Sequence, residues 1–233
     1  MAEPEPSKFA IHEAARDGRT QVVESLLAAN PKFAQRVDDD GRLPLHWAVS
    51  YNHLDIAKLL AATKDFDADV QDGSGWTPLM IAVSLKDGEE LVDLLLRKDA
   101  DVNAKTLHFV SSKKNIDLAR RLLDHNPHAS ARVKDKRGQY AIHRAAAVGS
   151  VPIVELLLKH KSPVNASDVA GQTPLHHAVA EGHGDTAVAL LKAGADAEKK
   201  DNDGFLALDL APDSQVKKYI LKAAEMEGIE IAS

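Results

Sequence analysis

The sequence predicts an all-α protein in which one helix-turn-helix unit is repeated seven times along a solenoid. Three observations lead to this fold class. A short phrase recurs about every 33 residues along the 233-residue chain, and an Asp with a Gly three positions later precedes five copies of it. The segments between are rich in Leu, Val, Ile and Ala at i, i+3 and i+4 spacing, which is typical of amphipathic helices. Because each unit would pack only on its neighbours, we expect a ribbon-like core.

The recurring phrase is most complete at residues 173–178, where it reads Thr-Pro-Leu-His-His-Ala. A T-P-L-H-x-A signal at a period near 33 residues indicates ankyrin repeats, in which a β-turn finger is followed by two antiparallel helices. The sequence therefore predicts an ankyrin-repeat solenoid of seven helix-turn-helix repeats with short β-turn fingers. The His position, or its replacement, falls at His12, His46, Met80, His108, His143, His176 and Asp209, in steps of 34, 34, 28, 35, 33 and 33 residues.

We expect a single repeat domain over residues 8–225, between a flexible N-terminus at 1–7 and a frayed tail at 226–233. The end repeats are atypical, because a terminal repeat has one face toward water and needs a polar cap. The first has no finger with a Gly, and the last carries Asp209 in place of His and then a polar helix over 213–220. Gly228 is expected to stop that helix. The repeats are expected to begin near residues 8, 41, 75, 105, 138, 171 and 204.

Each predicted finger has an Asp at its first position and a Gly at its fourth. This pair suits a type I turn, since the carboxylate can accept a nearby backbone N–H and Gly tolerates the exit from the turn. The Asp residues are Asp38, Asp72, Asp135, Asp168 and Asp201, and the Gly residues are Gly41, Gly75, Gly138, Gly171 and Gly204.

The fourth repeat lacks its finger. Only five residues lead from Val102 to Leu107, whereas eleven lead from Val164 to Leu175. A natural deletion, a stretch lost from this sequence and an error in the gene structure are three open explanations. The helices of the repeat look intact, so we expect the third and fourth repeats to stack, with the weakest coupling of the solenoid at this junction. The side chains expected in that contact are Leu94, Leu95, Leu118 and Leu122.

Composition excludes several classes of protein. There is no Cys, which removes disulfides, thiolate catalysis and Cys-containing zinc sites, and no run of about 18 apolar residues predicts a membrane span. We therefore expect a soluble intracellular protein, cytoplasmic and nuclear, that binds neither membrane nor nucleic acid. Charge is banded: residues 1–104 carry −8, residues 105–161 carry +8 and residues 162–233 carry −6. Such bands fit an elongated protein partner with opposite bands, because they set register and speed encounter.

The recurring histidines are the only candidates for chemistry, and their period argues against it. A side chain repeated once per unit has a shared structural task, which we predict to be a hydrogen bond from each ring to the backbone of the neighbouring finger. Rings one repeat apart lie too far from one another to bind one metal ion. The sequence also lacks the phosphate-binding, nucleophile-elbow and zinc-protease motifs. We expect no catalytic residue, no metal and no cofactor, and the chain is not expected to be an enzyme.

Candidate binding residues stand where the repeat pattern does not specify the side chain, directly after the His and directly after the finger Gly. Both tryptophans and two arginines occupy such positions, and Trp and Arg are enriched in binding hot spots. The tryptophans could instead only cover the inner helices. Asp38 and Asp72 are expected to form turns, and the basic residues of the central band could be an ordinary solvated face. The predicted partner-binding residues are Asp39, Asp40, Arg42, Trp47, Asp72, Trp76, Lys113, Lys114 and Arg144.

Four stretches of the chain resemble the gankyrin family and its fungal members: residues 41–48, 74–79, 142–149 and 180–185. That family consists of chaperones for assembly of the proteasome regulatory particle. The resemblance implies that the concave face binds the C-terminal helical domain of one triple-A ATPase subunit, the third of the ring, and that the free protein is a monomer. It also places Arg42, Trp47, Asp72, Trp76 and Lys113 or Lys114 in the contact region.

Two features limit the resemblance. The L-x-C-x-E segment of the metazoan relative, linked to retinoblastoma protein, is replaced here by residues 177–181, without Leu or Cys, so that activity is not expected. The missing finger before Leu107 also departs from the family. The alternative function is a signalling regulator that inhibits a kinase or retains a transcription factor, since other ankyrin proteins do this through the same face.

Overall fold

The computed structural model of the protein describes residues 8–102, 105–126 and 129–231. By its internal contacts the chain divides into two compact units, residues 1–104 and 105–233. The expected domain range, 8–225, includes helices of both units, whereas the expected flexible segment, 1–7, lies outside the described residues. The boundary coincides with the position of the missing finger.

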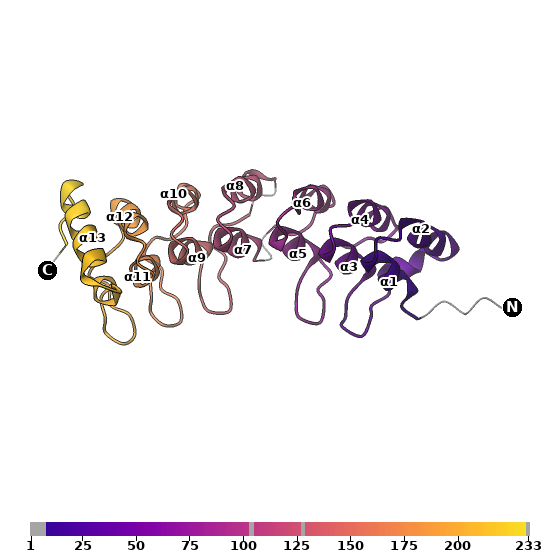
Figure 1. The fold of residues 1–233 in the computed structure, drawn as a ribbon, viewed down its shortest axis with the longest axis horizontal. Coiled ribbons are helices and arrows are strands. Elements are labelled where there is room, and N and C mark those ends of the chain that lie inside the picture. The colour runs from indigo at the N-terminus through magenta and orange to yellow at the C-terminus, as the bar shows by residue number, and fades with distance from the viewer. Residues whose placement is uncertain (1–7, 103–104, 127–128, 232–233) are drawn as a thin grey trace. The chain divides into compact units, whose positions relative to one another are not determined.

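The first unit contains three helix pairs. Figure 1 shows the first helix of each pair in one layer and the second in another, with two finger loops extending beyond the first layer. The elements are α1 (Ala10–Arg16), α2 (Thr20–Ala29), the 3-10 helix η1 (Pro31–Gln35), α3 (Pro44–Ser50), α4 (Leu54–Ala61), α5 (Pro78–Ser84) and α6 (Glu89–Leu96).

The second unit contains three further pairs and a terminal repeat in which a 3-10 helix takes the place of the first helix (Figure 1). Across the described residues there is no β-strand, and the one β-bridge joins Lys200 to Leu206. These findings confirm the predicted all-α repeat architecture. The elements are α7 (Thr106–Ser112), α8 (Ile116–Asp124), α9 (Ala141–Ala147), α10 (Val151–Lys159), α11 (Pro174–Ala180), α12 (Gly184–Lys192), η2 (Ala207–Leu210) and α13 (Ser214–Met226).

Each unit has an aliphatic core between its two helical layers. In five of the inner helices an Ala lies two residues after the His or its replacement, is fully or almost fully buried and allows close approach of neighbouring helices: Ala14, Ala48, Ala82, Ala145 and Ala178. In α7 this buried position is held by Val110. Burial of one Leu or Ile side chain contributes about 1.5–3 kcal/mol, so these ladders supply most of the stabilisation. The largest fully buried side chains are Leu45, Ile56, Leu60, Leu79, Leu91 and Leu95 in the first unit and Leu122, Leu123, Ile142, Ile153, Leu157 and Leu175 in the second.

The ends of the helices follow from local sequence. Pro begins α3, α5 and α11, where its fixed φ suits the first turn and its missing N–H is not needed. Asp213 caps α13 by accepting the backbone N–H groups of Gln215 and Val216. That helix runs to Met226 and is followed by Gly228 at φ 72°, which confirms the predicted stop. No helix in the described ranges combines the length and apolar character needed to cross a membrane.

Candidate functional site

The finger aspartates build the turns on which the candidate site stands. One oxygen of Asp38, Oδ1, accepts the N–H groups of Asp40 at 3.0 Å and Arg42 at 2.8 Å. The backbone N–H of Asp38 in turn donates to the carbonyl of Arg42 at 2.9 Å and closes the hairpin. Asp72, Asp135, Asp168 and Asp201 accept the same two N–H groups in their own fingers. The interpretation of Asp38 and Asp72 as turn formers is confirmed.

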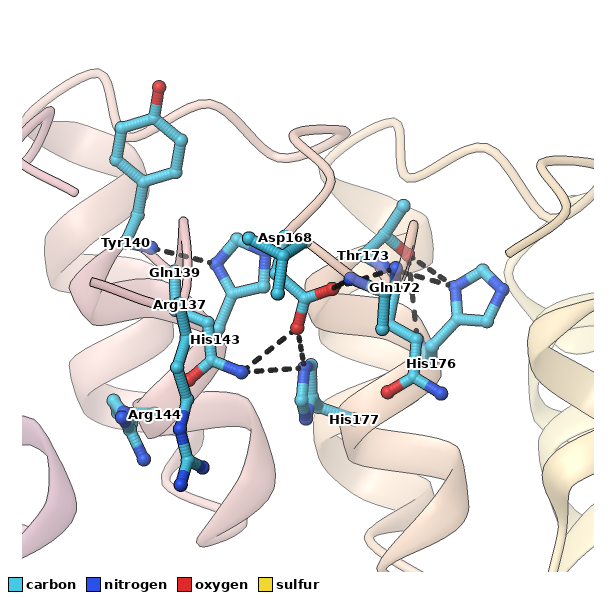
Figure 2. A network of polar contacts seen from close by, with 12 residues as sticks. Arg137, Gln139, Tyr140, His143, Arg144, Asp168, Gln172, Thr173, His176 and His177 are labelled. Carbon is cyan, nitrogen blue, oxygen red and sulfur yellow. Dashed lines mark hydrogen bonds and ion pairs between the residues drawn. The ribbon is translucent and has the colours of Figure 1, made fainter. Parts of the chain in front are cut away.

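The second carboxylate oxygen binds the side chain nine positions further on, directly after the His of the same repeat. Trp47 Nε1 donates to Asp38 Oδ2 at 2.6 Å, and Arg144 Nη2 donates to Asp135 Oδ2 at 2.8 Å. In the sixth repeat the donor to the finger carboxylate is His177, at 3.0 Å from its Nε2 (Figure 2). A finger is therefore tied to its own inner helix wherever position nine carries a donor.

A third contact links one finger to the next. Arg42 follows the glycine of its finger, and its Nε donates to Oδ2 of Asp72 at 3.1 Å. Gln139 occupies the same place in its finger and donates to Asp168 Oδ2 at 2.9 Å (Figure 2). Burial acts to raise the pKa of Asp168, but hydrogen bonds, chiefly those from Gln139 and His177, outweigh it and hold that pKa below its usual value.

Three of the predicted site residues of the first unit form one cluster. The guanidinium of Arg42 lies 4.8 Å from the centre of the Trp47 ring while its Nε binds Asp72. Trp47 is stacked in turn on Tyr51, with ring centres 6.4 Å apart. A cation between an aromatic face and a buried carboxylate is held in one orientation, which lowers the entropy lost when a partner binds. This cluster is the best-organised part of the candidate surface.

The other predicted residues lie outside that cluster. Asp39 and Asp40 are exposed at the finger tip, where Asp39 has Lys8 Nζ at 3.9 Å, and Trp76 is half-buried after the next finger glycine. In the second unit Lys113 and Lys114 are exposed just after α7, whereas Arg144 is one-third exposed and bonded to Asp135.

Two residues of this network, Gln139 and His177, are not among the predicted binding residues. Gln139 is buried at 6 % exposure and donates to Asp168, and His177 binds the same carboxylate oxygen. For His177 the signal is the spacing of nine residues from a finger Asp to a polar side chain, and for Gln139 it is the position after a finger glycine that Arg42 also occupies.

The periodic histidines have the predicted structural role. In His46, Nδ1 accepts the N–H of Leu43 at 3.1 Å, so the ring proton lies on Nε2. Nε2 donates to the carbonyl of Val70, which precedes the next finger, and to that of Trp76 within this finger. His143 repeats the arrangement with Tyr140 and Ala166. Burial, assisted by the neighbouring His177, lowers the pKa of His143 to about 4. The His46 and His143 rings are therefore neutral near pH 7, and each links its helix to the next repeat by hydrogen bonds.

Two of the histidines lack one of these bonds, and both stand in repeats without a finger of their own. Nδ1 of His12 and of His108 is buried with no hydrogen-bond partner in the described ranges. The residue three positions earlier is extended where a finger precedes it, with ψ near 160°, and its N–H then meets the ring. Here Phe9 has ψ 20° and Lys105 has ψ 8° with φ 55°. The absent finger thus removes a hydrogen bond inside the helix layer.

The described residues contain no group of three or more His, Asp or Glu side chains that could hold a metal ion. Asp168 already accepts two backbone N–H groups, Gln139 and His177. These hydrogen bonds use both carboxylate oxygens to orient neighbouring groups. The network is largely buried, with the Asp168 side chain 4% exposed and the His177 side chain 19% exposed.

Comparison with known proteins supports the repeat assignment. The family described as ankyrin repeats (3 copies) matches residues 11–106 and 107–201. Two solved structures are similar: the human ASB11 ankyrin repeat domain, with a TM-score of 0.78, 24% identity and coverage of 91% of this chain and 96% of that one, and the ankyrin repeat domain of Bcl-3, with a TM-score of 0.74, 23% identity and coverage of 93% and 99%. At these identities they support the fold alone.

Two fungal relatives match at higher identity. A Saccharomyces cerevisiae protein named "Probable 26S proteasome regulatory subunit p28" is 40% identical over 226 residues, which cover 92% of this chain and 98% of the yeast protein. The Schizosaccharomyces pombe "Ankyrin repeat-containing protein C6C3.08" is 37% identical over 219 residues, with coverage of 91% and 93%. Both alignments span nearly the whole of each protein.

Proposed function

Because this chain belongs to the gankyrin-type family of ankyrin-repeat proteins, we propose that it is a non-catalytic assembly chaperone of the proteasome regulatory particle. The observation that carries the proposal is 40% identity over 98% of a yeast protein whose name describes a 26S proteasome regulatory subunit. In this proposal the chain works in the cytoplasm and nucleus, is a monomer when free, and grips the C-terminal helical domain of the third triple-A ATPase subunit with its concave face. The bound chaperone then delays docking of the base on the core particle by steric exclusion.

The arrangement of the first unit supports a protein-binding role for Arg42 and Trp47. Arg42 is 29% exposed and already oriented by Asp72 and the Trp47 ring. A preorganised Arg beside a Trp is typical of a hot spot, where a few residues carry most of the binding energy. Asp39 and Asp40 on the adjoining tip, and Lys113 and Lys114 in the second unit, are exposed charges that would meet opposite charges on the partner.

The test is a pull-down with the tagged full chain from cell extract, followed by identification of the bound proteins. We expect a regulatory-particle ATPase, and we expect Trp47→Ala to reduce its recovery strongly. Lys159→Ala serves as a control, because Lys159 is an exposed residue of the outer helix α10. If no regulatory-particle ATPase is recovered, the proposal is contradicted. Recovery of a kinase or a transcription factor in its place would favour the signalling alternative.

A further inference from the structure

A basic cavity opens at the start of the second unit, between α7 and the finger of the fifth repeat. Its volume is about 320 Å³. In the first unit the corresponding space of a repeat with its own finger is crossed by a side chain, as when Arg42 reaches Asp72. The fourth repeat has no finger of its own, and therefore no side chain equivalent to Arg42 that could reach the finger of the fifth repeat. The cavity is lined by Lys105, His108, Phe109, Ser112, Asp135, Lys136, Arg137 and Arg144.

The positive charges around this cavity are not balanced by ion pairs among the residues that the structure describes. Asp135 is the one acid of the lining, and it already binds Arg144 and the N–H groups of Arg137 and Gln139. The side chains of Lys105, Lys136 and Arg137 make no ion pair within the ranges that the structure describes. Arg137 and Arg144 lie on the same side of the polar network (Figure 2). Three cations that form no ion pair with any described residue therefore line one small cavity.

The first unit supplies an internal comparison. It too begins with a repeat that lacks a finger, and a cavity of about 240 Å³ lies at the same place. There Asp39 and Asp40 stand in the finger positions of Lys136 and Arg137. The fold therefore forms this cavity with either charge, and the basic lining of the second unit is not a requirement of folding. The first cavity is lined by Phe9, His12, Glu13, Arg16, Asp38, Asp39, Asp40 and Trp47.

We propose that the basic cavity is a phosphate-binding site that receives a phosphorylated Ser or Thr side chain of a protein partner. A phosphoryl group carries about −1.5 to −2 charges near pH 7 and three acceptor oxygens, which matches several converging cations better than a single carboxylate does. Arg137 can bind such a group through two parallel N–H bonds, and Lys105 and Lys136 act as point charges. Phe109 offers an apolar wall for the carbon atoms of the phosphorylated residue.

This inference is separate from the proposed chaperone function, although Arg144 belongs to both surfaces. Its test contains no ATPase, so either can fail while the other stands. The probes are three short peptides that differ only in a central phosphothreonine, threonine or glutamate, together with inorganic phosphate. Each is titrated calorimetrically into the full chain and into two double variants.

The first variant, Lys136→Asp with Arg137→Asp, copies the Asp39 and Asp40 tip of the first unit. The matched control, Arg120→Asp with Lys159→Asp, removes the same charge from exposed positions of the outer helices α8 and α10. We expect the wild-type chain to bind the phosphothreonine peptide, the finger variant to bind it at least about tenfold more weakly, and the control to stay within about twofold, since charge-assisted phosphate bonds are among the strongest that side chains make. If the finger variant does not fold, Lys105→Ala with Arg137→Gln replaces it.

Equal binding of the glutamate and phosphothreonine peptides would overturn the proposal, because the cavity would then respond to charge alone. Equal weakening in the control would overturn it too, by showing a general effect of net charge. Inorganic phosphate that binds as tightly as the phosphopeptide would overturn the assignment to a protein side chain.

Discussion

Arg42 and Asp72 join two successive fingers of the first unit. The Nε of Arg42 lies 3.1 Å from Oδ2 of Asp72, a side chain that is only 2% exposed. Two residues from successive repeats, each in a turn of its own, thereby share one hydrogen bond. The link orients Arg42 for a partner and satisfies a buried acceptor, so it serves binding and stability together.

Replacement of Arg42 should test this link. Arg42→Ala leaves the Asp72 oxygen without its side-chain donor and should cost about 1 kcal/mol of unfolding free energy, since solvent can partly replace the lost bond. Arg42→Glu places a like charge against Asp72 and should cost more. Urea melts measure both, with Lys58→Ala as the control, because Lys58 only makes an exposed pair with Asp55. Equal losses in the Ala and Glu variants would contradict the proposed geometry.

Stability should fall as the pH is lowered from 6.5 to 4. Above 6.5 His143 is neutral in both states. Below 6.5 the unfolded chain takes up a proton, whereas the folded ring, with its pKa lowered to about 4, does not. That difference alone corresponds to a loss of roughly 3 kcal/mol across the window. Burial also lowers the pKa of His46, His108 and His176, and adds to the fall.

Chemical denaturation at several pH values measures this effect, and His143→Gln should flatten the slope. A free energy of unfolding that is constant from pH 7 to pH 5 would show that these rings are not buried as neutral groups.

A finger inserted before Lys105 should strengthen the chain. About six residues carrying Asp-x-x-Gly would make the residue before α7 extended and supply the N–H that Nδ1 of His108 lacks, worth about 1 kcal/mol. Without the finger we expect the two units to unfold in two stages, and with it in one. Mass spectrometry first establishes the covalent sequence of the peptide from Asn103 to Lys113. Denaturant melts of the two chains then measure the number of unfolding transitions. Identical midpoints and one transition in both would refute the weak junction.

Two glycines separate backbone strain from steric clash. Gly149 and Gly194 both have positive φ, 69° and 87°, so Ala at either position should cost about 1–2 kcal/mol. At Gly149 an added Cβ would lie 2.5 Å from Nδ1 of His183, whereas at Gly194 it meets no atom within 4 Å. Gly149→Ala should therefore be the more destabilising by about a further 1 kcal/mol or more in thermal melts. If the two variants have the same melting temperature, His183 packs on this turn more loosely than the structure shows.

The charge bands should control the rate of partner binding. If exposed acid and base bands steer the ATPase domain, the association rate should fall steeply with salt, because charges are screened within about 8 Å at physiological ionic strength. Arg144→Glu should slow association far more than Arg144→Ala. Stopped-flow measurement with the purified domain at low and high salt tests both, and a rate that does not change with salt would reject steering.

The sequence by itself determined the repeat, the helices and the turns. These features arise within a few residues: Pro44 starts a helix, Asp38 accepts the N–H groups of its own finger, and the His46 ring accepts an N–H three positions before it. Local hydrogen bonds and apolar periodicity depend on spacing along the chain, and spacing is visible in a sequence. The all-α repeat fold and the role of the histidines were predictable for this reason.

Only the tertiary structure decided which side chains meet across repeats. Arg42 and Asp72 stand 30 positions apart, and Gln139 and Asp168 stand 29 apart. Whether such a pair forms depends on how neighbouring repeats are stacked and on which donor also reaches the same oxygen. The cavity at Lys136 and the unpaired nitrogen of His108 likewise follow from the space left by an absent finger. Packing between elements, and not the order of residues within one, sets these distances.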